Sequence, residues 1–191
     1  MTRTRTRDSQ APSSSTWKAV EAAALREWGR ALHAQGKLSA ARECLQEALA
    51  LTRGGPRGLR ASVLTCLGAV ERHCEKANRV QELLDQALAL YGDLGDEWGR
   101  SQVLNELAHV AEDRSNLSAA KAYAEEALRL SRTMGRRYLM GAAQTTLGRI
   151  ALAGDDYGAA IGHCERALSS ARDRGDPAGT AEALIELARI H

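Results

Sequence analysis

Residues 147–168 read LGRIALAGDDYGAAIGHCERAL and contain two helical patterns joined by a short turn. Their apolar and small residues recur at three- and four-residue intervals, which is the spacing of one helix face and not of a strand. The turn Gly154-Asp155-Asp156 interrupts the pattern, and Asp156 stands where it can cap the second helix. The stretch therefore predicts two helices, over roughly 138–153 and 157–173.

The same two-helix pattern recurs with a period of about 40 residues. Three series of residues mark it: a leucine in each first helix, an alanine before a leucine in each second helix, and a glycine that closes the second helix. They are Leu67, Leu107, Leu147 and Leu187; Ala48, Ala87, Ala127 and Ala167; and Gly95, Gly135 and Gly175. Such repetition is typical of solenoids. Asp176-Pro177 reads as an N-cap and a first-turn proline, which predicts one more helix.

Two further positions of the repeat stay small. They are Gly29, Gly68, Ala108, Gly148 and Ala188 in the first helices, and Ala41, Val80, Ala120 and Ala160 in the second helices. A glycine inside a helix costs roughly 1 kcal/mol relative to alanine. Such a position is best explained by a neighbouring helix that passes very close.

Leu147-Gly148, Tyr157, Ala160 and Ala167 resemble the tetratricopeptide repeat, which has Leu-Gly in its first helix and two small residues in its second. The resemblance covers about residues 17–191 and implies an all-α, right-handed α-α superhelix of four helix pairs plus a terminal helix. We expect copies over 17–56, 57–96, 97–136 and 137–176, a terminal helix over 177–191, and a disordered basic tail over 1–16.

The copies depart from the usual repeat because they are longer than 34 residues and lack the proline that commonly follows the second helix. In this they look most like the C-terminal arrays of bacterial LuxR-type, maltose-regulator-like and antibiotic-regulator-like ATPases. The chain has no GxxxxGK[ST] phosphate loop. The resemblance therefore implies only the sensor arm of such a regulator.

Composition and charge argue against several classes of protein. Hydrophobic residues make up 44% of the chain and charged residues 26%, as in soluble globular proteins. The net charge of +2 is carried by residues 1–16, where three arginines outnumber one aspartate, so the rest is neutral and lacks the basic footprint of nucleic-acid binding. No stretch reaches the ~20 apolar residues of a membrane span. The four cysteines lack CxxC spacing, and we expect them reduced and mostly buried in a cytoplasmic protein.

By resemblance, the first helix of each pair lines the concave face, which is the expected binding surface. The expected partner-binding residues are Arg26, Arg30, His33, Thr65, Arg72, His73, Gln102, Asn105, His109, Glu112, Thr145, Arg149 and Arg189, together with Ser62, Asp113 and Leu152. Arginine binds carboxylates through two parallel hydrogen bonds. An acidic peptide or a C-terminal carboxylate is therefore the expected ligand, and an ordinary solvated face is the alternative for any single residue.

The sequence predicts no catalytic, cofactor or metal site. His33, His73 and His109 fall on one face of successive first helices, but neighbouring helices pack ~10 Å apart, which is too far to share one ion. The acidic pairs Asp93 with Asp96 and Asp155 with Asp156 read as helix caps and loop charges.

The terminal helix is apolar nearly all round, with polar residues only at Glu182, Glu186 and Arg189 along most of its length. One side is expected to pack on the fourth pair, and this leaves an apolar face over. Such faces mark association sites. Self-association and continuation of the chain both explain it.

The sequence therefore predicts a non-enzymatic scaffold that binds a protein or a peptide on its concave face. The alternative is a sensor arm of a bacterial transcriptional regulator that binds a small molecule or a signalling peptide. One architecture serves many functions in repeat proteins, so the fold does not identify the partner.

Overall fold

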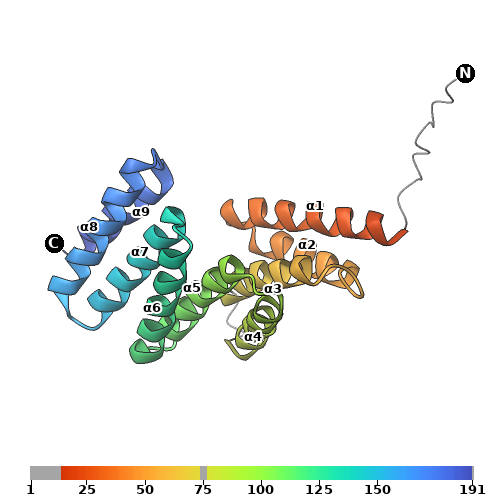
Figure 1. Ribbon diagram of the computed structural model, residues 1–191, viewed down its shortest axis with the longest axis horizontal. Coiled ribbons are helices and arrows are strands. Elements are labelled where there is room, and N and C mark those ends of the chain that lie inside the picture. Colours follow the sequence, from red (N-terminus) through yellow and green to blue (C-terminus); the bar gives the residue numbers. More distant parts are fainter. Residues whose placement is uncertain (1–13, 74–76, 191) are drawn as a thin grey trace, which may run out of the picture.

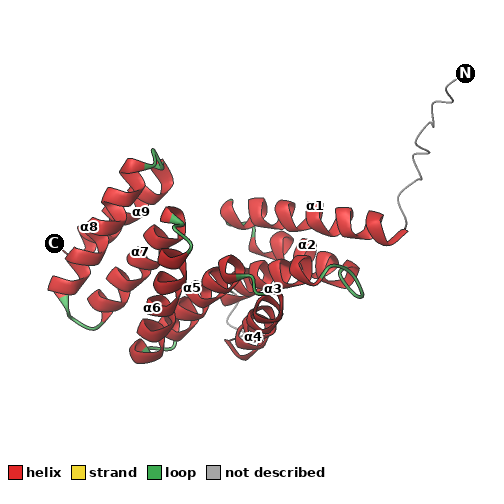
Figure 2. Ribbon diagram, in the orientation of Figure 1, coloured by secondary structure: helices red, strands yellow, loops and turns green. Residues whose placement is uncertain are grey.

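The structure, a computed structural model, describes residues 14–73 and 77–190. Within these residues it is built of helices and contains no strand (Figure 2). The helices are α1 (Ser14–Ala34), α2 (Leu38–Leu51), α3 (Arg57–Arg72), α4 (Ala77–Leu94), α5 (Glu97–Asp113), α6 (Leu117–Thr133), α7 (Arg137–Ala153), α8 (Tyr157–Asp173) and α9 (Pro177–Ile190). The predicted all-α repeat superhelix is confirmed. Helix α1 begins at Ser14, three residues before the expected first copy, and most of the expected tail lies outside the described residues.

The helices form pairs that follow one another along the molecule (Figure 1). Each odd-numbered helix packs against the even-numbered helix after it, and each pair packs against the next. Successive odd helices also contact one another, whereas among the described helices successive even ones do not. The odd helices are therefore closer together and line the inner side of the curve.

Local signals set the ends of the helices as the sequence predicted. Asp156 and Asp176 accept hydrogen bonds from the backbone N–H groups three residues on, at 3.0 Å each. Gly175 has a φ of +62°, the left-handed conformation that glycine adopts at no steric cost. In the turn after α7, Asp155 and not Gly154 takes the left-handed conformation, which aspartate tolerates better than most residues.

The small residues of the first helices lie where each pair crosses, as predicted. A methyl group at Gly68 would lie 2.7 Å from Cδ2 of Leu84, and one at Gly29 would lie 2.7 Å from Cγ of Leu45. At Gly148 it would lie 2.4 Å from Sγ of Cys164.

The two sides of this crossing compensate one another in size. Leu45, Leu84 and Cys164 occupy one equivalent position of the second helices, and each faces a glycine. In the third pair that position is Ala124, and the residue at the glycine position is Ala108; both are fully buried in one cluster. A larger residue on one helix is thus matched by a smaller one on the other, which keeps the pairs equally close.

Helix α9 packs on α8 and α7 and leaves the expected apolar face exposed. Leu184 is 43% exposed and Ile185 is 60% exposed. Glu186, one of the few polar residues of this helix, is only 6% exposed and accepts a hydrogen bond from Arg189. None of the described helices is long and apolar enough to cross a membrane.

Candidate binding cleft on the inner face

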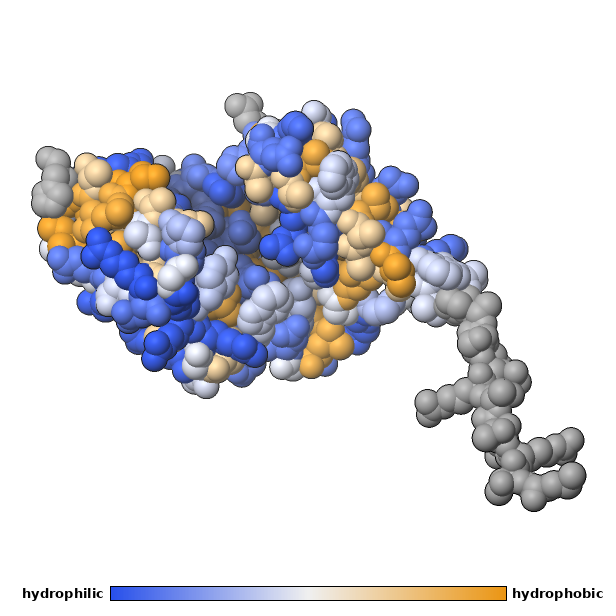
Figure 3. Space-filling model, turned by 90° about the horizontal axis from the view of Figure 1, so that it is seen from above, coloured by the Kyte–Doolittle hydropathy of each residue, from blue (hydrophilic) through white to orange (hydrophobic). Residues whose placement is uncertain are grey.

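A cleft with a volume of about 740 Å³ lies on the inner side of the first two and a half pairs. Helices α1, α3 and α5 form most of its wall, and the end of α4 closes it. The space-filling view shows the molecule hollowed between its two ends (Figure 3). Of the residues predicted from the sequence, the cleft brings together Arg26, Arg30, His33, Ser62, Thr65 and Gln102.

One side of the cleft is basic. Arg26 donates a hydrogen bond to Oγ of Ser62 on α3 at 3.0 Å, and its guanidinium also pairs with Glu27. Arg30 pairs with the same carboxylate at 3.1 Å. Two guanidinium groups thus share one acid, Glu27, whose side chain is 54% exposed.

The other side of the cleft contains residues that the sequence did not single out. They are Leu59, Cys66, Tyr91, Trp98 and Glu106, with further apolar residues at the floor. Tyr91 is 3% exposed and its ring fills the space beside Gly99, where a methyl group would lie 2.3 Å from Cε1. Trp98 is 46% exposed and lies in the first turn of α5. The sequence does contain a signal for these residues, because the aromatic Tyr91 and the pair Trp98-Gly99 lie on either side of the turn between α4 and α5.

Burial acts on two weakly acidic groups of the cleft. It raises the pKa of Tyr91, although a hydrogen bond with Ser62 opposes it. It also raises the pKa of the Cys66 thiol to about 11, against the lowering effect of the Arg30 and Arg26 charges. Both groups are therefore uncharged at neutral pH, and Cys66 lacks the thiolate that a reactive cysteine needs.

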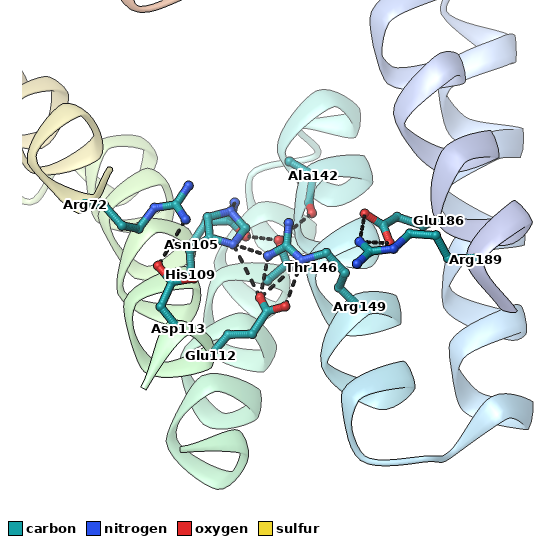
Figure 4. Close-up of polar contacts among 10 residues, drawn as sticks. All are labelled: Arg72, Asn105, His109, Glu112, Asp113, Ala142, Thr146, Arg149, Glu186 and Arg189. Atoms are coloured by element: carbon teal, nitrogen blue, oxygen red, sulfur yellow. Dashed lines mark hydrogen bonds and ion pairs between the residues drawn. The ribbon is translucent and has the colours of Figure 1, made fainter. Parts of the chain in front are cut away.

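Further along the inner side, the predicted residues form bridges between repeats (Figure 4). Arg149 of α7 donates from Nε to the two carboxylate oxygens of Glu112 on α5, at 3.0 and 3.2 Å, and from Nη2 to Nδ1 of His109. Thr146 donates to Oδ1 of Asn105 at 2.9 Å. These contacts tie α5 to α7.

A second bridge of this kind ties α3 to α5. Arg72 donates to Asp113 at 3.1 Å, with 24% of its side chain exposed.

Burial opposes ionisation of Glu112, but the neighbouring His109 and Arg149 outweigh it and lower its pKa to about 2. Arg72 and Arg149 therefore already have carboxylate partners within the chain.

Two predicted residues offer less to a partner than expected. Thr145 is only 4% exposed and donates to the carbonyl of Gly141, so it offers little surface to a partner. Its neighbours Gln144 and Thr146 are also buried, because α7 packs against α5, α6, α8 and α9. Arg189 is exposed but pairs with Glu186 on its own helix.

His33 and His73 are closer than the helix spacing predicted. Their ring centroids lie 5.4 Å apart, because both side chains extend across the ~10 Å that separates two packed helices. The sequence argument, that the helix spacing is too large for these histidines to share one ion, did not include the reach of the side chains. Burial lowers the pKa of His33, and the nearby His73 lowers it further. Among the described residues there is no group of three or more histidine, cysteine or acidic side chains that could hold a metal ion.

Residues 101–134 match the family model of the tetratricopeptide repeat. This segment of the chain resembles that repeat. The matched segment starts within α5 and ends after α6, so it covers most of the third helix pair. No curated protein sequence matches the chain.

Solved structures show the same fold at low sequence identity. A Rap protein in complex with competence and sporulation factor superposes with a TM-score of 0.82 at 19% identity, over 89% of this chain and 48% of that one. BtubC (BKLC) from P. vanneervenii superposes with a TM-score of 0.69 at 17% identity, over 94% and 84%. A putative kinesin light chain of Podosopora anserina gives 0.68 at 19% identity, over 91% and 86%.

The chain spans about half the length of the Rap protein that it matches. These similarities show the fold, a superhelix of tetratricopeptide-type helix pairs. The likeness of the long repeats to those of regulator ATPases stays a prediction.

Proposed function

We propose that this chain is a protein- or peptide-binding scaffold and that its partner lies in the cleft between α1, α3 and α5. The observation that carries this proposal is the chemistry of the cleft wall, which sets two arginines opposite an exposed tryptophan around about 740 Å³. That volume falls in the ~300–1,000 Å³ range of ligand pockets. The Rap protein, which has the same fold, was crystallised in complex with competence and sporulation factor, and this supports the proposal.

A carboxylate of the partner is assigned to the α1 side of the cleft. Arg26 and Arg30 share the exposed Glu27, and exposed ion pairs of this kind contribute only ~0–1 kcal/mol. A ligand carboxylate can therefore displace Glu27 at little cost and bind both guanidinium groups. Arg149, which the sequence also suggested for this role, is held by Glu112.

An apolar side chain of the partner is assigned to the opposite wall. Trp98 offers a large, rigid surface, and such residues dominate the energetics of protein interfaces. Leu59 and Cys66 lie in the same cleft and add apolar surface. The proposed ligand is thus an extended segment with an acidic group or a free C-terminus near one apolar residue.

A displayed library of random peptides with free C-termini tests this assignment. Peptides selected on the native protein are expected to carry acidic groups and to bind at least tenfold more weakly to Arg30→Glu and to Trp98→Ala. Arg172→Glu, an exposed charge reversal on α8, is the matched control and is expected to bind as the native protein does. Selected peptides that bind all four proteins equally would place the site outside the cleft.

We propose a second contact surface on α9. Leu184 and Ile185 are exposed on this helix, and the space-filling view shows apolar residues gathered at the C-terminal end (Figure 3). Exposed apolar patches on a folded protein mark association sites. Self-association through α9 is therefore proposed, separately from ligand binding in the cleft.

A further inference from the structure

Both ends of the superhelix expose an apolar helix face. On α1 the face contains Trp17, Val20 and Trp28, which are 58%, 54% and 58% exposed, and the exposed Ala24 and Ala31 lie between and beyond them. Intervals of three and four residues place these five side chains in one stripe. On α9 the face contains Leu184 and Ile185, with the exposed Ala181 and Ala188 at the same spacing.

Three of the five positions that are exposed on α1 are buried in the next repeat. Ala24, Trp28 and Ala31 correspond to Val63, Leu67 and Val70 of α3, which are all 0% exposed. Helix α2 precedes α3 and packs against it, whereas in the described part of the chain no helix precedes α1. The α1 face is thus the surface that a preceding helix covers elsewhere in the molecule.

Two of the positions that are exposed on α9 are buried inside the superhelix, whereas Ile185 corresponds to Thr65, which is half-buried and lines the cleft. Leu184 and Ala188 correspond to Leu64, which is 0% exposed, and to Gly68, which Leu84 of the following helix α4 covers. The α9 face is therefore the surface that a following helix covers elsewhere. Among the described residues, no helix precedes α1 and none follows α9.

We infer that α9 of one copy packs antiparallel on α1 of the next copy, so that one contact covers both faces. This rests on the proposed self-association through α9 and is independent of ligand binding in the cleft. A register that sets Trp28 over Ala181 of the other copy also sets Ala24 opposite Ile185. In an antiparallel pair, residue numbers fall along one helix as they rise along the other. A large residue meets a small one at both places.

Charge supports the same register. This register brings the exposed Glu21 beside Arg189 of the other copy, whose side chain is 59% exposed. Both charged groups flank the apolar stripes, where an ion pair fixes register and orientation without being buried.

Such a contact joins two different surfaces and so differs from a two-fold dimer. A head-to-tail contact leaves one free face at each end and therefore builds open chains or closed rings. Pairing of α1 with α1, or of α9 with α9, uses the same surface twice and stops at a dimer. The two arrangements make opposite predictions for variants that disable one face.

Sedimentation velocity of Trp28→Glu, of Ile185→Glu and of their equimolar mixture tests the contact. Native protein is expected to grow beyond a dimer as its concentration rises. Each variant alone is expected to stay monomeric, since it lacks one of the two faces, and the mixture is expected to form a dimer and nothing larger. Both residues are exposed, and circular dichroism with thermal melting checks that each variant is folded.

A native protein that is monomeric at all concentrations, or a mixture that stays monomeric, overturns the inference. Assembly by only one of the two variants overturns it in favour of a two-fold contact through the remaining face. The cleft-selected peptides serve as a separate readout, because neither residue lines the cleft. Loss of assembly with unchanged peptide binding, or the reverse, shows which of the two proposals fails.

Oxidative cross-linking tests the register. Copies carrying Ala24→Cys are mixed with copies carrying Ile185→Cys, and peptide mapping is expected to find a disulfide between positions 24 and 185. Arg172→Cys on α8 is the control and is expected to cross-link to neither position. A 24–24 or a 185–185 disulfide as the main product contradicts the antiparallel contact between α1 and α9.

Discussion

Replacement of Gly68 by alanine is expected to destabilise the protein, although alanine is the better helix former. The added methyl group would lie 2.7 Å from Cδ2 and 3.0 Å from Cγ of Leu84, well inside the ~3.5–4.0 Å of a favourable carbon contact. Leu84 is 0% exposed and has no free space into which to turn. Overpacking costs ~1–3 kcal/mol, and the gain in helix propensity returns ~1 kcal/mol. The expected net loss in the free energy of unfolding is therefore about 1 kcal/mol.

Changing both Gly68 and Leu84 gives a stricter test of the packing between α3 and α4. Leu84→Ala alone removes a fully buried leucine side chain and is expected to cost ~2–5 kcal/mol. In the double variant the alanine at position 68 fills part of the space that Leu84 left. That pair reproduces the Ala108 and Ala124 pair of α5 and α6. The double variant is therefore expected to be more stable than the sum of the single changes by ~1–2 kcal/mol.

Urea unfolding followed by circular dichroism at the helix band measures these changes. Gly162→Ala in the middle of α8 is the matched control, because the nearest group is the guanidinium of Arg166 at 3.5 Å. This control is expected to gain up to ~1 kcal/mol. A gain of the same size at Gly68, or single changes that simply add, would refute the size compensation between the paired helices.

Three further predictions follow from buried groups. Ala127→Leu is expected to cost ~1–3 kcal/mol, because Ala127 is 1% exposed, and an unchanged melting temperature would show that it does not lie at a helix crossing. The pKa of Glu112, about 2 in the folded protein, lies below its unfolded value, so its contribution to stability is complete above pH ~4.5 and is lost as the pH falls toward 2. Glu112→Gln is expected to flatten the dependence of the urea midpoint on pH in that window, and an unaltered pH profile argues against the bridge to Arg149. Burial raises the pKa of Cys66 to about 11, so alkylation at pH ~8 is expected to be slow in folded protein and fast in urea, which mass spectrometry measures.

Local rules account for how much of the fold could be predicted. Asp156 and Asp176 cap helices, and Gly175 adopts its left-handed conformation, because each depends only on residues a few positions away. The close helix crossings at the glycines could also be predicted. Glycine destabilises a helix interior, so its presence at one position in several copies indicates a neighbouring helix that packs closely there. The repetition strengthened the prediction of the fold, because each copy shows the same pattern of residues independently.

The candidate site was predicted only in part, because it depends on how helices turn toward one another. Arg26 and Arg30 were expected on the inner side and do line the cleft. Trp98 was missed, because it belongs to the opening turn of α5 and faces the cleft only after α4 and α5 have packed. Thr145 was expected on the inner surface, but this part of α7 is buried because α7 packs against α5, α6, α8 and α9.

The sequence by itself determined that this protein is a stack of helix pairs and where the helices of the fourth pair begin and end, since caps and glycines act over short distances along the chain. Only the tertiary structure decided which polar side chains are available to a partner. Arg149 and Arg30 are the same residue type on equivalent helices, yet Arg149 is held by Glu112 of another helix, whereas Arg30 lines the cleft and pairs only with the exposed Glu27 of its own helix. The reason is physical: a side chain's partners come from helices about 40 residues away in the sequence, and their distance is set by the packing of the whole array.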